Sequence, residues 1–359
     1  MSTITNNEPA RASTEYCPTL ELLPMRSKNK NNFTTSITTV LITLSLLLVP
    51  ATVVFADNPS IEAQKLIDEM SRASHELNYD GVFIYKQAGQ MNTMRIIHRA
   101  DKEGEHERLV SLTGFAREVI RDGNTVRCYY PEKQSVMVEK SQAGKLVSSY
   151  LPHPIESISE YYQFTIVAED RVAGRDAWVV NIIPGDKYRY GYQLWIDQDS
   201  KLLLKSELKN GNGATLEQIM FTQLDVLEQI PDSLLEPTIT GTDYTWYETA
   251  ANGKAKMQNG GNHWKVTWMP GGFAMSEYGK QSMSNSKMPV DHMVFTDGLA
   301  MVSVFIEKLT KDLQVVEGPS TMGGINTFAI LSGEYQVTAV GEVPRATVKL
   351  MAGSAKQVE

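Results

Sequence analysis

The densest group of side chains that could bind a metal lies between residues 98 and 107. It holds two histidines and three glutamates: His98, Glu103, Glu105, His106 and Glu107. Imidazole nitrogens and carboxylate oxygens are ligands that zinc takes from proteins. These residues also surround an expected hairpin tip, where a run of charges is usually a solvated surface. We therefore predict no metal site here.

A catalytic triad is the second chemistry to consider. Asp291, His292 and Ser303 have the required side chains, but nothing in the sequence supplies oxyanion donors beside them. The chain has no G-x-S-x-G turn, no H-E-x-x-H pair and no phosphate-binding loop. We expect no catalytic residues and no cofactor.

Aromatic residues in the expected strands give a clearer signal. Phe83, Tyr85, Tyr129, Trp195 and Phe221 stand in runs that are often apolar at neighbouring positions. A strand with one buried face alternates polar and apolar residues, so apolar residues on both sides predict that the second face is covered too. A helix, a neighbouring domain or an acyl chain could cover it. We take these five residues as the candidate lipid-binding set, with ordinary core packing as the alternative.

The elements that position these residues are mostly strands. Ser60 can cap a helix that runs to about residue 78, and a helical segment is expected at residues 154–162. The other runs have strand period and hairpin spacing. Ten strands are expected, at residues 81–85, 94–98, 107–112, 116–120, 125–130, 164–168, 177–183, 190–196, 202–208 and 217–224. They predict one antiparallel meander, a half-open barrel with both helices on its concave side.

A second group of strands follows a segment rich in glycine, threonine and asparagine. We expect a large domain at residues 57–237, a linker at 238–260 and a small β-rich domain at 261–359. The small domain should contain a hairpin around Thr296-Asp297-Gly298 and a closing helix near residues 344–354. The predicted class is mainly β.

The N-terminal segment predicts export. An uncharged run at residues 37–49 follows Arg26, Lys28 and Lys30, and Val-Phe-Ala at residues 54–56 stands directly before Asp57. This pattern is typical of a signal peptide, here residues 1–56 with an extended front end. The alternative is an uncleaved anchor helix at residues 36–55, because about 20 apolar residues can cross a bilayer.

Charge excludes one class of partner. The formal net charge is −8, and we find no basic cluster in the part that should fold. Nucleic-acid binding needs lysine and arginine to neutralise phosphates. We therefore expect no nucleic acid partner.

Several long blocks resemble the RseB/MucB family. They are LVSLTGFAREVIR at 109–121, YGYQLWID at 190–197, LLLKSEL at 202–208, LEQIMFT at 216–222, VFTDGLAMVSVFIE at 294–307 and VTAVGEVP at 337–344. The resemblance implies a periplasmic protein whose large domain is an unclosed barrel similar to the lipoprotein carriers LolA and LolB. It implies binding to the periplasmic domain of a membrane anti-sigma factor, protection of that factor from regulated proteolysis, and release by lipopolysaccharide or a lipoprotein-derived lipid.

For the anti-sigma contact we expect the small domain to contribute most. The candidate residues are Trp268, Phe273, Phe295 and Phe305, and Phe273 and Phe305 are expected to be exposed. The alternative for the hairpin at residues 294–307 is core packing, which Val302, Val304 and Ile306 would favour. The alternative function is a periplasmic lipid or lipoprotein carrier, and a homodimer is left open.

Overall fold

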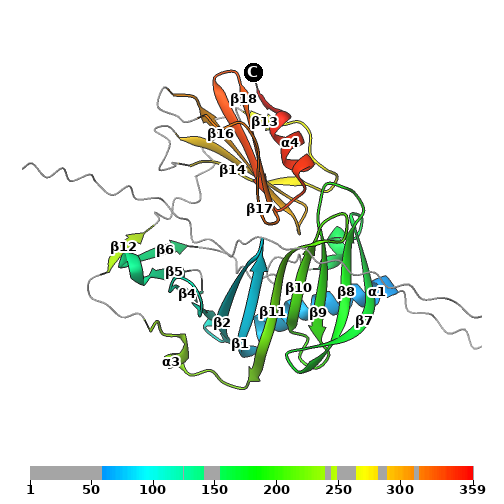
Figure 1. The fold of residues 1–359 in the computed structure, drawn as a ribbon, viewed down its shortest axis with the longest axis vertical. Coiled ribbons are helices and arrows are strands. Elements are labelled where there is room, and N and C mark those ends of the chain that lie inside the picture. The colour runs from blue at the N-terminus through cyan, green and yellow to red at the C-terminus, as the bar shows by residue number, and fades with distance from the viewer. Residues whose placement is uncertain are drawn as a thin grey trace, which may run out of the picture.

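The computed structural model describes residues 59–123, 125–140, 154–238, 244–248, 264–281, 289–310 and 315–358. These residues form two main sheets, one of twelve strands and one of six, and the smaller sheet lies above the central strands of the larger one in the view of Figure 1. We call residues 59–248 the N-terminal part and residues 264–358 the C-terminal part. The expected signal segment, residues 1–56, lies outside the described residues.

Helix α1 (Pro59–Glu76) begins and ends close to the prediction. Its buried side chains recur every three or four residues, so they share one face of the helix. That face packs with 3-10 helix η2 (Ile155–Ile158) and with β7 to β10 (Figure 1). The helix expected at residues 154–162 is thus only the short η2 turn. No helix among the described residues is long and apolar enough to cross a bilayer.

The strands of the large sheet confirm the expected hairpins and add two strands. They are β1 (Asn78–Gln87), β2 (Gln90–Asp101), β3 (Gly104–Ser111), β4 (Glu118–Asp122), β5 (Thr125–Tyr130), β6 (Ser135–Lys140), β7 (Tyr162–Val172), β8 (Arg175–Pro184), β9 (Gly191–Asp197), β10 (Leu203–Lys209), β11 (Thr215–Leu227) and β12 (Thr245–Glu248). Sequence reasoning missed β6 and β12. Short helices η1 (Pro131–Lys133) and α3 (Asp232–Leu235) lie in connections.

The order of these strands corrects the prediction of one continuous meander. The sheet runs β12-β6-β5-β4-β3-β2-β1-β11-β10-β9-β8-β7, so two meanders join where β1 pairs with β11. Strands β6 and β7 follow one another along the chain, but they lie near opposite ends of the large sheet. The sheet remains unclosed, as predicted. Hairpin spacing reveals only local pairs, and the β1–β11 pair is not local.

The segment expected to be a linker contains a strand. Of residues 238–260 the structure describes only residues 238 and 244–248, and β12 there pairs in parallel with β6. The large sheet therefore extends past the boundary that we placed at residue 237.

Both faces of β8 to β10 are buried, as the apolar runs predicted. Val180, Leu194 and Leu203 pack with α1 and η2. The side chains that alternate with them, Val179, Trp195 and others, pack with residues of β1, β2 and β11. Protein side chains therefore cover the second face.

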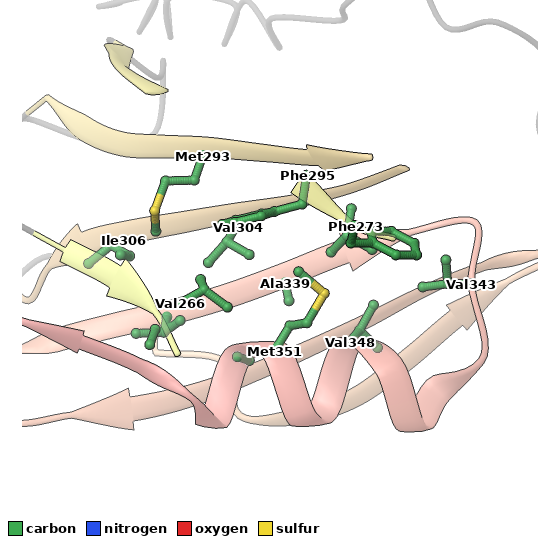
Figure 2. Close-up of a cluster of buried hydrophobic side chains, with 14 of the residues drawn as sticks. Val266, Phe273, Met293, Phe295, Val304, Ile306, Ala339, Val343, Val348 and Met351 are labelled. Atoms are coloured by element: carbon green, nitrogen blue, oxygen red, sulfur yellow. The ribbon is translucent and has the colours of Figure 1, made fainter. Parts of the chain in front are cut away.

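The C-terminal part is a six-stranded sheet with one helix on it. Its strands are β14 (Ala274–Gln281), β15 (Val290–Thr296), β16 (Met301–Lys308), β17 (Gly318–Met322), β18 (Ile325–Ser332) and β19 (Tyr335–Gly341), in the order β14-β15-β16-β19-β18-β17. Helix α4 (Arg345–Gly353) packs on one face, and Figure 2 shows Val348 and Met351 pointing from it toward Phe295 and Val304. Strands β13 (Trp264–Val266) and β20 (Ala355–Gln357) form a separate pair.

Candidate functional site

Four of the five candidate lipid-binding residues lie in one buried cluster. Phe83, Tyr85, Trp195 and Phe221 are each less than 10% exposed, and they come from β1, β9 and β11. The rings of Phe83 and Phe221 lie 5.4 Å apart. We call these four residues the aromatic cluster. It forms part of the core of the N-terminal part, as the packing alternative predicted.

Polar partners fix two members of the aromatic cluster. The hydroxyl of Tyr85 donates to Glu217 at 2.9 Å, and the indole N–H of Trp195 donates to Asp170 at 2.8 Å. The Lys205 Nζ atom lies 3.8 Å from the centroid of the Trp195 ring, a cation–π distance. An acyl chain that enters here must move side chains that already pack and hydrogen-bond.

Tyr129 stands apart from the aromatic cluster. It packs with Ile120 and Val136 in a small buried group. Its ring meets the ring of Trp246 on β12 edge-on, with the centroids 6.3 Å apart. Trp246 is 55% exposed, so this end of the large sheet carries an aromatic surface that β12 brings to it.

The four candidate partner-binding residues lie in three different places: the core under α4, the opposite face of the small sheet, and the junction of the two parts. Phe273 and Phe295 are buried in the core under α4 (Figure 2). The expectation that Phe273 is exposed is therefore wrong, since its ring packs inward and also lies 5.3 Å from the Arg189 guanidinium. Phe305, which was also expected to be exposed, is instead half-buried and stacks on His292, with the ring centroids 4.3 Å apart. Val302, Val304 and Ile306 are buried, as the core alternative predicted.

Trp268 lies where the two parts meet. Its ring is half-buried and meets the ring of Tyr188 edge-on, with the centroids 5.1 Å apart. Tyr188 precedes β9, and Trp268 follows β13, so the contact joins the N-terminal part to the C-terminal part. Among the four candidates, Trp268 therefore marks the junction and Phe305 marks the face of the small sheet away from the core.

The candidate triad does not assemble. His292 Nε2 and Ser303 Oγ lie 3.1 Å apart, but Asp291 accepts a hydrogen bond from the Tyr278 hydroxyl. Neighbouring residues of a strand point to opposite faces, so Asp291 cannot orient the ring of His292. Burial lowers the pKa of His292 to about 4, which makes it a weak base at neutral pH.

The expected metal-like group splits into two sets of ion pairs. Glu105 lies 3.1 Å from His75 and 3.8 Å from His98. His106 instead approaches Asp122 at 3.1 Å and Asp101 at 3.5 Å. Asp101, Glu103 and His106 come within 4.8 Å of one another, but Asp101 also pairs with Arg99 at 2.9 Å. The five residues named from the sequence therefore do not converge on one point.

A buried ion pair joins the two parts, and sequence reasoning missed it. Arg189 Nη1 and Asp297 Oδ2 lie 2.7 Å apart, and both side chains are 0% exposed. The Tyr162 hydroxyl donates to the same oxygen at 2.9 Å, and Arg189 also donates to the carbonyl of Gly271. The second carboxylate oxygen of Asp297 accepts the N–H groups of Leu299 and Ala300 in the β15–β16 turn. We call Arg189 and Asp297 the interface ion pair.

The residues around Arg189 supply most of the other polar contacts between the parts. The carbonyl of Tyr188 accepts from the Thr347 hydroxyl at 2.6 Å, and the hydroxyl of Tyr190 accepts from the Asn326 amide at 2.9 Å. The hydroxyl of Tyr192 donates to Glu342 at 2.8 Å. This run, KYRYGY at residues 187–192, is dense in aromatic and basic side chains. Aromatic and arginine side chains are enriched at interfaces, but this run alone does not indicate which segment it contacts.

Comparisons with known proteins match both parts of the chain. A family model described as the MucB/RseB N-terminal domain matches residues 62–239, and one described as the MucB/RseB C-terminal domain matches residues 258–356. The sigma factor AlgU regulatory protein MucB of Pseudomonas aeruginosa is 30% identical over 319 residues, which cover 86% of this chain and 93% of that protein.

Two further comparisons agree with these. The sigma-E factor regulatory protein RseB of Escherichia coli K12 is 26% identical over 316 residues, which cover 86% of this chain and 96% of that protein. The solved complex of Pseudomonas aeruginosa MucA and MucB has 29% sequence identity to this chain and a TM-score of 0.66. That likeness covers 83% of this chain and 99% of the solved one.

Proposed function

The chain belongs to the MucB/RseB family, and we propose that it is a periplasmic negative regulator of a sigma-E-type envelope-stress response. In this role it binds the periplasmic domain of a membrane anti-sigma factor and protects that factor from regulated proteolysis. Lipopolysaccharide or a related lipid then releases the anti-sigma factor. The export signal expected at residues 1–56 supports the periplasmic location.

One observation carries the proposal. The likeness to MucB as it occurs in a complex with MucA has a TM-score of 0.66 and covers 83% of this chain, both sheets included. A carrier would need only the large sheet. Binding of a protein partner would explain why the chain also has the small sheet and a buried junction between the two sheets.

For the anti-sigma contact we propose the face of the small sheet that α4 does not cover. Phe305 and His292 stack there on neighbouring strands, and Ser303 lies within hydrogen-bonding distance of His292. Phe273 and Phe295 would support this face from the core. Trp268 lies at the junction, and through it a change in the contact between the two parts would reach this face of the small sheet.

Substitution of Phe305 tests this surface. We expect Phe305→Ala to weaken binding of the anti-sigma periplasmic domain by about tenfold or more, because a half-buried aromatic ring can contribute 2 kcal/mol or more to an interface. Leu350→Ala is the matched control, since Leu350 is 42% exposed on α4, away from this face. Isothermal titration with residues 57–359 measures both. Equal affinities for the wild type and Phe305→Ala would reject this surface.

For the lipid we propose the aromatic cluster as the acyl-chain site. Its contiguous apolar side chains span β1, β9 and β11, and each buried methylene of a chain contributes about 0.8 kcal/mol. An acyl probe that carries a photoreactive group should label β1, β9 or β11 as read by mass spectrometry. Labelling confined to exposed residues outside these strands, such as Met91, Leu112 and Phe115, would reject this site.

A lipid or lipoprotein carrier is the second candidate, and the unclosed large sheet favours it. Removal of residues 249–359 separates the two functions and leaves β12 in place. A carrier keeps its lipid binding and transfer between vesicles after this deletion. A regulator loses binding of the anti-sigma factor. Circular dichroism of the shortened chain controls for folding.

A further inference from the structure

Two carboxylates from different parts of the chain meet inside the junction. Glu217 comes from β11, and Glu342 comes from the connection between β19 and α4. A Cβ atom added at Gly324 would lie 2.9 Å from the Glu217 Oε1 atom and 3.3 Å from the Glu342 Cγ atom, so both side chains border the same small space. We call Glu217 and Glu342 the glutamate pair.

The groups that face the glutamate pair are almost all neutral donors. Glu217 accepts from the Tyr85 hydroxyl at 2.9 Å, from the Gln87 amide and from the Gly324 N–H at 3.0 Å. Glu342 accepts from the Tyr192 hydroxyl at 2.8 Å.

A cation on α4 lies near this space, since it shares Asn326 with Gly324, but its guanidinium bonds to other groups. Arg345 on α4 donates from Nε to Thr321 at 2.8 Å and to the Asn326 amide oxygen at 3.3 Å. Tyr192, which bonds to Glu342, and Tyr190, which bonds to Asn326, are neutral at physiological pH because burial raises the pKa of each. Among the described residues, neither glutamate forms an ion pair with a lysine or arginine.

Two half-buried carboxylates that border the same space without a cation cannot both ionise without a cost in free energy. Burial first, and then the charge of Glu217, raise the pKa of Glu342 to about 8. Burial also raises the pKa of Glu217. When the two parts separate, water reaches both groups, and glutamate in water has a pKa of about 4.3. The docked junction therefore holds a proton at neutral pH that the separated parts would release.

We propose that docking of the C-terminal part on the N-terminal part takes up a proton at the glutamate pair, so that the junction tightens as pH falls and loosens as pH rises. The sign follows from linkage, because the docked form binds more protons than the separated form. Between the pKa of glutamate in water and the higher pKa in the junction, the docking constant falls by up to about tenfold for each pH unit. The inference does not depend on the proposed anti-sigma partner.

Hydrogen exchange on residues 57–359 tests the proposal. Protection factors, which correct for the intrinsic pH dependence of exchange, are measured from pH 6 to pH 9. Peptides that contain Gly324 and Tyr192 should lose protection by up to about tenfold per pH unit up to about pH 8. Protection in the buried face of α1 should not change, which separates loosening of the junction from general unfolding.

Matched variants assign the effect to the pair. Glu342→Gln keeps the shape of the side chain without its charge, so protection at the junction should depend on pH much less than in the wild type, with only Glu217 left to titrate. Glu317→Gln, an exposed glutamate of the same part, should behave as the wild type does. Protection in the wild type that is constant with pH, or an equal loss in Glu342→Gln, would overturn the proposal.

A measurement on the wild type alone covers the case in which Glu342→Gln does not fold. The amide proton of Gly324 bonds to Glu217, so its chemical shift follows ionisation of the pair. A midpoint well above 6 supports the proposal. A midpoint near 4.5 overturns it.

Discussion

At the scale of single residues, Asp297 performs two tasks that the sequence shows only in part. Thr296-Asp297-Gly298 predicts a turn, and one carboxylate oxygen does bond to the N–H groups of that turn. The other oxygen meets Arg189, which lies 108 positions earlier in the chain. Local sequence cannot reveal a partner that only the docking of two sheets brings close.

Substitution of Asp297 separates its two tasks. Asp297→Asn keeps an oxygen for the turn but leaves the buried Arg189 charge with only the partly exposed Asp186 as a counterion. A buried ion pair that loses one partner typically costs about 3–5 kcal/mol. We expect a loss of this size in the free energy of unfolding, measured by urea denaturation.

The matched control is the second carboxylate beside Arg189. Asp186 lies 3.2 Å from Arg189, but its side chain is 33% exposed. Asp186→Asn should cost no more than about 1 kcal/mol. Similar losses for the two variants would contradict the central place that we give to the interface ion pair.

At the scale of elements, helix α1 and the hairpins of the large sheet could be predicted because their signals are local. The Asp-Gly turn between β4 and β5 and the spacing of apolar residues in α1 both appear within a few residues. Strand β17 could not be predicted, since four of its five residues are exposed and it lacks apolar alternation. Strand β12 was missed because it lies in a segment rich in glycine and asparagine.

Helix α1 gives a matched pair of substitutions. Ile67 is 0% exposed against β7 to β10, whereas Ile61 on the same helix is 63% exposed. Ile67→Ala should lower the free energy of unfolding by about 2–5 kcal/mol through the lost burial and the cavity that it leaves. Ile61→Ala should change it by no more than about 0.5 kcal/mol. Equal effects in thermal denaturation would mean that α1 does not cover the sheet as described.

At the scale of the whole molecule, the family and the open large sheet could be predicted, but the junction could not. The sequence places the aromatic residues on strands, yet Trp268 turns out to contact Tyr188 of the other part, and Phe273 turns inward. The glutamate pair gives no sequence signal at all, because Glu217 and Glu342 are ordinary glutamates until the two sheets enclose them. Interfaces between distant segments are therefore the part of the candidate site that needed the structure.

Side-chain contacts across the junction join the two sheets. The interface ion pair, Trp268 and the glutamate pair all join the part that we propose for the lipid to the part that we propose for the anti-sigma factor. If each ligand prefers a different arrangement of the two parts, each must weaken binding of the other by the same factor. Regulation by lipid then needs no direct competition for one surface.

Digestion of the anti-sigma periplasmic domain tests the central claim most directly. The rate of the first regulated cut is measured with the domain alone, with residues 57–359 added, and with lipopolysaccharide added to the mixture. We predict that the chain slows the cut and that lipopolysaccharide restores the original rate. A cut that proceeds equally fast with and without the chain would contradict the proposed function, and protection that lipopolysaccharide leaves intact would contradict its control by lipid.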